Sequence, residues 1–383
     1  MNRDLFFMPS HREQRGWIPY DTALISDAVS DAFVQQLVQT EIKNPEKLIV
    51  TIDHDVPNST VAVGAKQRML IDWAVEQGIR LEKCQGIGYL RVLENHDLTH
   101  QVMIGTGIHM NGFGAAGALG ITCREEDFLD YLQKGEVQLP NLTTLSLSLT
   151  GSLPENTSIQ DAAVYLFQHV QKSCHSQTLV LLTGDGLASY TMDELFDLCH
   201  WIKEAGAFSV IVSKQVDIPV DYELSLHEIV PMVMKPGENS DVCLLKEIME
   251  AVEVQEVFIG GCRGGKIADL RNAASVLRNH KVQDKVRLII APATSSVYCQ
   301  ALREGLISDF LNAGALIMNQ GCSVCWGKAQ GILDDGEVLV STGSYHYPGC
   351  AGSKTAKVYL VSPAIAAGCA ITGRLYGQER IRE

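Results

Sequence analysis

Short apolar runs alternate with helix-like stretches along almost the whole chain, and this alternation limits the possible folds more than any other feature of the sequence. The strand-like runs cover residues 48–52, 102–104, 145–149, 179–182, 257–260, 286–290 and 338–341. Helical patterns cover 65–77 and 192–205, and the second ends before Gly206, a residue type that commonly closes helices. Strands that alternate with helices usually pair in parallel, so we predict an α/β fold.

The expected domain organisation follows from the length and from two breaks in this alternation. The chain has 383 residues, more than one ordinary hydrophobic core contains. The alternation restarts near residues 134–140, and a polar, turn-forming run, KPGEN, occupies 235–239. We therefore predict three α/β lobes, at residues 1–136, 137–240 and 241–383.

Charge and hydropathy restrict the partners of the chain. Its net charge of −14 argues against a nucleic-acid partner, because such binding depends on cationic contacts. No apolar run reaches the roughly 18 residues of a membrane span, so we expect no membrane partner either. Residues 1–16 contain no leader-like segment, and eleven cysteines then fit a reducing compartment. We expect a globular, cytoplasmic protein.

The sharpest chemical motif is the pair Cys322 and Cys325, which lies between Gly321 and Trp326. Two cysteines at this spacing can bind one metal ion or one iron–sulfur cluster from a single turn. The same spacing also suits a redox pair or two small buried residues. All three interpretations stay open on the pair alone.

A third cysteine, Cys262, lies in the segment VFIGGCRGGKIADL. An apolar strand leads into a glycine-rich turn, and an amphipathic helix follows. Backbone N–H groups and a helix N-terminus near the turn favour a thiolate. The alternatives are a small buried residue or a phosphate-binding loop, although neither full nucleotide-binding pattern is present.

The order of these motifs resembles the aconitase family, and most of all the large subunits of 3-isopropylmalate dehydratase and homoaconitase. The motifs are Gly-Gly-Cys262, then Gly321-Cys322-x-x-Cys325-x-Gly327, then Ser362-Pro-Ala-x-Ala-Ala. TIDHDVPNST from Thr51, LRNAASVLRNHKV and VRLIIAPATSSVYCQALREGL are similar to the family too. The resemblance implies an aconitase-like core of three α/β lobes around a central iron–sulfur cleft.

In that family, three cysteines hold a [4Fe–4S] cluster whose fourth iron stays open. The resemblance assigns the three ligands to Cys262, Cys322 and Cys325. The open iron acts as a Lewis acid on a substrate hydroxyl, so the implied activity is that of a hydro-lyase or isomerase working by dehydration and hydration.

The resemblance also supplies four acid–base or iron-shell candidates. Asp53 and His54 match an acid–histidine pair at a strand end, although such a pair also suits the cap of the next helix. Glu204 matches a glutamate near the open iron, but is equally an ordinary charge at a helix end. His109 matches a family histidine if the register slips by one; it lies in the glycine-rich segment 105–120, which we expect to bring backbone close to a neighbour.

The loop at 342–350 departs from the family. Two family arginines, which hold substrate carboxylates, are absent from it. Arg263, directly after Cys262, is expected to supply one guanidinium to the substrate site in their place. Ser344, Tyr345 and His346 offer neutral hydrogen-bonding groups for a substrate. We therefore expect an unusual hydroxy acid as the small-molecule substrate, less charged than citrate.

Two further expectations concern partners and rival functions. The family's swivelling fourth domain is not expected within this chain, so a separate small subunit is the expected partner. The rivals are a non-catalytic iron–sulfur sensor or regulatory protein, and an enzyme of different chemistry that reuses the cluster. Cys350, where the family has its second loop arginine, is a possible fourth ligand that would favour the sensor.

Overall fold

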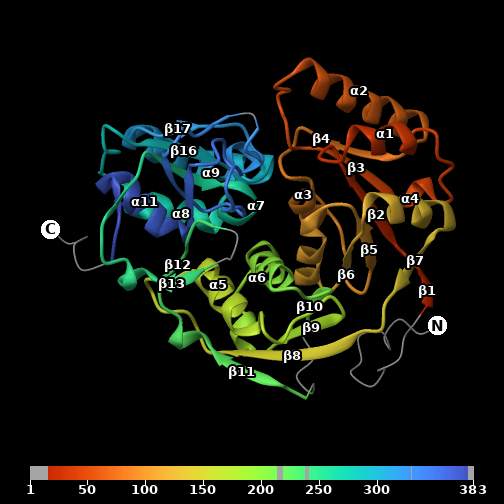
Figure 1. The fold of residues 1–383 in the computed structure, drawn as a ribbon, viewed down its shortest axis with the longest axis horizontal. Helices are drawn as coiled ribbons and strands as arrows, with labels where there is room; N and C mark the ends of the chain where they lie inside the picture. The colour runs from red at the N-terminus through yellow and green to blue at the C-terminus, as the bar shows by residue number, and fades with distance from the viewer. Residues whose placement is uncertain (1–15, 214–218, 238–240, 329, 378–383) are drawn as a thin grey trace. The chain divides into compact units, whose positions relative to one another are not determined.

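A computed structural model describes residues 16–213, 219–237, 241–328 and 330–377 (Figure 1). The segment 1–15, on which the expectation of no leader rests, and part of the KPGEN turn lie outside these residues. The chain forms two compact units. The first comprises Met1–Cys84, Arg91–Leu153 and Leu166–Glu228, and the second comprises Gln85–Leu90, Pro154–Tyr165 and Ile229–Glu383. The division into three lobes stays a prediction.

The first unit contains a five-stranded parallel sheet with the order β4-β3-β2-β5-β6. Its strands are β2 (Thr22–Ser26), β3 (Leu48–Ile52), β4 (Arg80–Lys83), β5 (Val102–Gly105) and β6 (Leu119–Thr122). The accompanying helices are α1 (Asp31–Leu37), η2 (Pro45–Lys47), α2 (Val61–Glu76), α3 (Gly88–Asn95), η3 (Ile108–Ala116) and α4 (Glu125–Lys134). The continuous apolar run of β3 is buried along its whole length, as expected for a central parallel strand.

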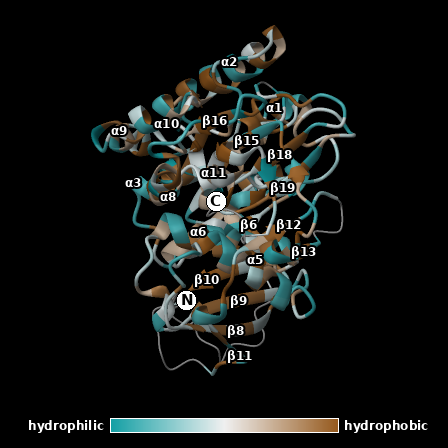
Figure 2. Cartoon of the chain, turned by 90° about the vertical axis from the view of Figure 1, so that its left-hand side faces the viewer, coloured by the Kyte–Doolittle hydropathy of each residue, from teal (hydrophilic) through white to brown (hydrophobic). Residues whose placement is uncertain are grey.

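A second parallel sheet of the same unit has the order β10-β9-β8-β11. Its strands are β8 (Thr143–Thr150), β9 (Thr178–Thr183), β10 (Ser209–Val212) and β11 (Tyr222–Ser225). Helical segments η4 (Asp185–Leu187), α6 (Met192–Glu204) and η5 (Leu226–Glu228) accompany it, and α5 (Ile159–Val170) precedes β9. A two-stranded antiparallel ribbon joins β1 (Gly16–Pro19) to β7 (Glu136–Leu139). Figure 2 colours β9 and β10 mainly brown, in keeping with their apolar sequences.

The glycine-rich segment does bring backbone close to its neighbours, as the sequence predicted. A Cβ atom at Gly112 would lie 2.0 Å from the ring of Phe196 in α6. A Cβ atom at Gly114 would lie 2.0 Å from the carbonyl oxygen of Val210 in β10. Only glycine allows η3 to pack this tightly, so the segment fixes where His109 emerges.

The second unit is built on a seven-stranded sheet with the order β13-β12-β19-β18-β15-β16-β17, in which β19 to β17 run parallel. The strands are β12 (Met232–Met234), β13 (Val242–Leu244), β15 (Glu256–Gly260), β16 (Arg287–Ala291), β17 (Leu316–Ile317), β18 (Val338–Ser341) and β19 (Lys357–Leu360). A separate antiparallel pair joins β14 (Val252–Glu253) to β20 (Arg374–Leu375).

The helical segments of this unit are η6 (Leu245–Glu247), α7 (Gly261–Gly264), α8 (Ile267–Leu277), α9 (Ser295–Arg303), α10 (Leu306–Ala313), η7 (Ser323–Trp326) and α11 (Pro363–Thr372). Apolar residues of α8, α10 and α11 join the sheet in one buried core. Two early segments complete the unit: Ile87 N–H donates to the Ala293 carbonyl at 2.9 Å, and Asp161 accepts from Met232 N–H at 2.9 Å.

The predicted α/β class with parallel sheets is confirmed, and each predicted strand and helix is present within a few residues. The helix predicted from residue 65 begins at Val61, because the Thr60 side chain caps it by accepting from Val63 N–H. The strand predicted at 286–290 is displaced by one residue to Arg287–Ala291. Within the part of the chain described here, no helix is long and apolar enough to cross a membrane.

Candidate active site

Three polar residues meet at the carboxyl ends of two adjacent parallel strands in the first unit. Asp53 and His54 directly follow β3, and Asp27 directly follows β2. Polar side chains at the carboxyl edge of a parallel sheet are well placed to form ligand-binding sites. The sequence predicted Asp53 and His54, whereas Asp27 was not predicted.

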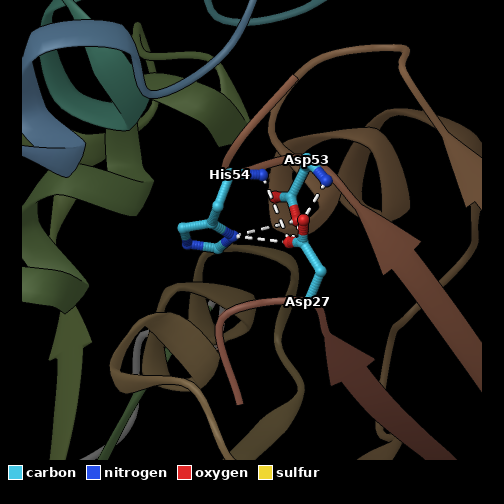
Figure 3. A group of neighbouring side chains, drawn as sticks. All are labelled: Asp27, Asp53 and His54. Atoms are coloured by element: carbon cyan, nitrogen blue, oxygen red, sulfur yellow. Dashed lines mark hydrogen bonds and ion pairs between the residues drawn. The ribbon is translucent and has the colours of Figure 1, made fainter. Parts of the chain in front are cut away.

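The imidazole of His54 lies against both carboxylates (Figure 3). Its Nδ1 atom is 3.1 Å from Oδ1 of Asp27 and 3.1 Å from Oδ1 of Asp53. Ser26 Oγ lies 3.4 Å from the same nitrogen. The other ring nitrogen, Nε2, lies on the side away from the carboxylates in Figure 3. Nδ1 is therefore the proton-bearing nitrogen that faces the acids.

Electrostatics make His54 a cation in this environment. Burial by itself lowers the pKa of His54, but the charge of Asp53 and the hydrogen bonds and charge of Asp27 outweigh burial and raise the pKa to about 10. His54 therefore carries a proton on both ring nitrogens near neutral pH. It is an acid or a hydrogen-bond donor there, rather than a base.

The helix-cap alternative for Asp53 and His54 does not hold in this structure. The cap of α2 is Thr60, whose side chain accepts from Val63 N–H. Asp53 instead accepts from Thr51 Oγ and contacts His54, and it is 3% exposed. The pair therefore does not serve as the cap of α2.

The other predicted histidine, His109, is paired with a residue that the sequence did not single out. Its Nδ1 atom lies 3.2 Å from Nδ1 of His200, a residue of α6 that is 1% exposed. Two imidazoles at this distance can share one proton, with one ring donating and the other accepting. The signal for His200 was only a lone histidine within an apolar helix.

Glu204 is the last residue of α6, and its side chain is exposed. Its neighbour Lys203 has a pKa lowered by burial and partly restored by the charge of Glu204. The predicted role of Glu204 near an open iron stays a prediction.

In the second unit, the predicted cluster cysteines lie in two turns. Cys262 lies in α7, directly after β15, whereas Cys322 and Cys325 lie at the start of η7 and within it, after β17. The 342–350 loop follows β18. Gly261 lies next to Cys325, since a Cβ atom there would be in ordinary contact with Cβ of Cys325 at 3.7 Å. Its φ of +75° is a conformation that favours glycine.

Ser344 joins these two cysteines. Its backbone N–H donates to Sγ of Cys325 at 3.4 Å, and its Oγ lies 3.4 Å from Sγ of Cys262. Ser344 is buried. The predicted substrate-binding residue Ser344 therefore contacts the predicted cluster ligands directly.

Arg263 is also part of this arrangement. It is 2% exposed, and its Nη1 donates to the carbonyl of Gly343 at 2.8 Å. Its own carbonyl accepts from Gln160 Nε2 at 2.6 Å and from the buried amino group of Lys266. Lys266 in turn pairs with Asp269 at 2.9 Å. The Arg263 side chain therefore connects the Cys262 turn to the 342–350 loop.

The thiols are electrostatically coupled. Burial, together with the nearby Cys262 and Cys350, raises the pKa of Cys325 to about 12, although the Ser344 N–H and the charge of Arg263 oppose the rise. Burial likewise raises the pKa of Cys350 to about 11. Burial and the charges of Cys325, Cys262 and Cys322 raise the pKa of Tyr345. Burial and the charge of Arg263 lower the pKa of His346.

The donor chemistry of the cysteine turns fits an iron–sulfur cluster. Ser344 contacts the sulfurs of both Cys262 and Cys325, and Cys322 lies in the same turn as Cys325. Thiolates are the ligands that such clusters use, with each cysteine bound to a different iron. Cys262, Cys322 and Cys325 are therefore the residues that would hold a [4Fe–4S] cluster.

Comparisons with known proteins bear on the identity of the chain. The family model for the aconitase family (aconitate hydratase) matches residues 7–222 and 238–373. A 3-isopropylmalate dehydratase large subunit 1 of Deinococcus radiodurans is 30% identical, over 94% of this chain and 88% of its own. The homoaconitase large subunit of Thermus thermophilus is also 30% identical, over 96% of this chain and 93% of its own.

Among solved structures, aconitase X of Thermococcus kodakaraensis in its holo form covers 85% of this chain and 83% of its own chain. The TM-score is 0.54 and the sequence identity 13%, so this likeness supports the fold alone. The family model and the two large-subunit relatives go further, because each covers most of the chain. The resemblance drawn from the cysteine motifs is thereby confirmed, and the chain belongs to the aconitase family of hydro-lyases.

Proposed function

We propose that this chain is the large subunit of a [4Fe–4S]-dependent hydro-lyase that acts on a hydroxy acid less charged than citrate. The observation that carries the proposal is the meeting of Cys262 and Cys325 at Ser344, with Cys322 in the same turn as Cys325. Cys262, Cys322 and Cys325 would hold the cluster. When bound, it supplies a Lewis-acid iron for the substrate hydroxyl.

The chain's own acid in this proposal is His54. Elimination of water from a hydroxy acid breaks a C–O bond, and the departing hydroxyl needs a proton. Protonated His54 offers one at Nε2, because Asp53 and Asp27 hold the Nδ1 side. Asp53 is thus a positioning residue, and His54 is the group that delivers the proton.

The elimination also removes a proton from the neighbouring carbon. The family resemblance gives this task to a serine of the swivelling domain, which here would come from a small subunit. The large-subunit names of the two relatives support such a partner. Glu204 and His109 remain acid–base or iron-shell candidates, with His109 able to pass a proton to His200.

The substrate part of the proposal is supported by the chemistry of the 342–350 loop. The raised pKa of Tyr345 and the lowered pKa of His346 keep both side chains uncharged near neutral pH. Among the described residues, the buried Nε2 of His346 has no hydrogen-bond partner, which leaves it available to a ligand. With Ser344, these groups form a neutral polar set, and the guanidinium of Arg263 reaches the same loop by donating to the Gly343 carbonyl. Such a set favours a substrate with few carboxylates.

The test is anaerobic purification followed by iron and acid-labile sulfide analysis and a screen of hydroxy acids, with and without a candidate small subunit. We expect bound iron and sulfide, turnover of a hydroxy acid only with the small subunit, and poor turnover of citrate, isocitrate and 3-isopropylmalate by the chain alone. A protein without iron or sulfide would refute the cluster. Efficient turnover of citrate by the chain alone would refute the substrate class.

One observation favours the rival sensor function. Cys350 is a buried thiol that lies close enough to Cys325 and Tyr347 to raise the pKa of both when it is ionised. As a fourth ligand it would occupy the iron that a hydro-lyase leaves open. Spectra of the reduced cluster in a Cys350→Ser variant separate the two functions.

A further inference from the structure

Asp27 lies at the centre of the hydrogen bonds around His54, although neither the motifs nor the family resemblance pointed to it. It follows β2 directly, whereas Asp53 and His54 follow β3. It is 4% exposed. The pairing of Ser26 with Thr51 across the two parallel strands brings the two turns together.

Both oxygens of the Asp27 carboxylate are occupied. Oδ1 accepts from the backbone N–H of Asp53 at 3.3 Å and of His54 at 3.2 Å, and it contacts His54 Nδ1 at 3.1 Å. Oδ2 accepts from Gln67 Nε2 at 2.8 Å. Several donors on one carboxylate fix its orientation.

The consequence for His54 is that one N–H faces two anions. Nδ1 carries a single proton, which lies between Oδ1 of Asp27 and Oδ1 of Asp53. One carboxylate is enough to select the tautomer. The second adds charge, because two anions next to one imidazole stabilise the imidazolium more than one does.

A purely structural role for Asp27 has to be separated from this one. By accepting two backbone N–H groups, Asp27 also shapes the turn at 53–54. An asparagine at this position keeps a carbonyl oxygen for those N–H groups but carries no charge. The two roles therefore make different predictions for Asp27→Asn.

We propose that Asp27 is a second positioning carboxylate that keeps His54 as an imidazolium, with a proton held ready at Nε2. The inference rests on the proposed function only for the use made of that proton. The protonation state itself is a property of the first unit, since Ser26, Asp27, Asp53, His54 and Gln67 all belong to it.

The charged groups that act on His54 agree with this inference. Burial lowers the pKa of His54, and the opposing influences come from Asp53 and Asp27, on the turns after β3 and β2. Two polar side chains beside this group are neutral: Ser26, which contacts His54, and Gln67, which contacts Asp27. Removal of the Asp27 charge should therefore leave burial opposed by Asp53 alone.

The experiment is an NMR titration of the His54 imidazole, assigned with a His54→Gln variant, in the wild-type chain, Asp27→Asn and Asp53→Asn. The matched control is Asp55→Asn. Asp55 is a buried aspartate of the same turn that accepts from Ser59 Oγ at 2.7 Å. Thermal unfolding of each variant verifies that it is folded.

We expect Asp27→Asn to lower the proton affinity of His54 at least tenfold, Asp53→Asn to do likewise, and Asp55→Asn to change it less than twofold. A His54 titration in folded Asp27→Asn that matches the wild type would overturn the inference, as would an equal effect in Asp55→Asn. These measurements need neither cluster nor substrate. If His54 responds but the loaded enzyme has no hydro-lyase activity, the proposed function fails while the role of Asp27 stands.

A second readout applies once a substrate is known. Asp27→Asn should shift the alkaline limb of the pH profile of kcat/KM to lower pH by the same amount as the NMR titration. An unshifted limb, in a variant whose His54 titration has moved, would show that His54 is not the acid of the reaction. That result would refute the use of the proton but not the imidazolium.

Discussion

The Asp27–Asp53–His54 group and the cysteine turns both bury ionisable side chains, but their neighbours act in opposite directions. At His54, two carboxylates outweigh the effect of burial and create a stable charge. At Cys325, burial and two neighbouring thiols act in the same direction, and they suppress the charge. In the first group, the carboxylates of the chain itself stabilise the charge of His54. The thiols of the second group need an added cation to stabilise their ionised form.

The difference shows what each region can do alone. His54 holds its proton through contacts that are all protein contacts, so the acid is preformed. The thiols of the second region are expected to deprotonate when a metal provides positive charge, because metals bind the thiolate form. The helping groups there, Ser344 N–H and Arg263, lower the pKa of Cys325 without bringing it to neutrality.

The largest effect should follow removal of a cysteine. Cys262→Ala, Cys322→Ala and Cys325→Ala should each lose most of the iron, because each removes one ligand of the proposed cluster. Iron and sulfide analysis of anaerobic protein measures the loss, and Cys299→Ala, an exposed cysteine on α9, serves as the control. Full retention of iron in all three variants would contradict the proposal that the cysteine region, unlike the His54 group, is completed by a metal.

The next largest effect concerns the buried ion pair under the cysteine turn. Lys266→Met should lower the free energy of unfolding by about 3–5 kcal/mol, because it leaves Asp269 buried without its cation. Denaturant unfolding provides the measurement. The double variant Lys266→Met with Asp269→Leu should recover much of the loss. A single variant as stable as the wild type would show that Asp269 does not need this partner.

A comparable effect, spread over several pH units, is expected on the pH dependence of stability. The pKa of His54 is raised in the folded protein, so its stabilising contribution is complete below about 6.5 and is lost as pH rises towards about 10. The free energy of unfolding should fall across that range by at most about 1.4 kcal/mol per pH unit. His54→Gln should flatten this slope. An equal slope in the variant would show that the pH dependence of stability comes from groups other than His54.

The smallest effect tests whether the cysteine region has three ligands or four. If Cys350 binds the cluster, Cys350→Ser should open a labile iron site and alter the spectrum of the reduced cluster. If the open-iron proposal holds, the spectrum should not change, and added ligands should already bind one iron of the native cluster. Electron paramagnetic resonance of the reduced protein, with and without an added ligand, decides between these outcomes.

β2 was not predicted, but the seven strands that were predicted are present, because their apolar runs are buried in parallel sheets. Asp53 and His54 were predicted because they follow such a run directly. Asp27 was not, because its meaning depends on the pairing of β2 with β3, which no local pattern contains. His200 was missed for the same reason, since its partner His109 is 91 residues away.

Arg263 shows a different limit of sequence reasoning. Its residue type and its place after Cys262 suggested a group that binds a substrate anion. The structure shows a guanidinium that is 2% exposed and bonded to the Gly343 carbonyl. A side chain's charge can be predicted from the sequence, but the backbone group that it contacts depends on how two distant turns pack.

The discontinuous make-up of the second unit has a consequence for how the protein can be divided. Its main segment, Ile229–Glu383, is completed by Gln85–Leu90 and Pro154–Tyr165. Gln160 supports the carbonyl of Arg263, and Asp161 accepts from Met232 N–H. A fragment that starts at residue 229 would therefore lack the side chains that brace its own cysteine turn. During synthesis, Gln160 and Asp161 therefore emerge well before Arg263 and Met232, the residues that they contact.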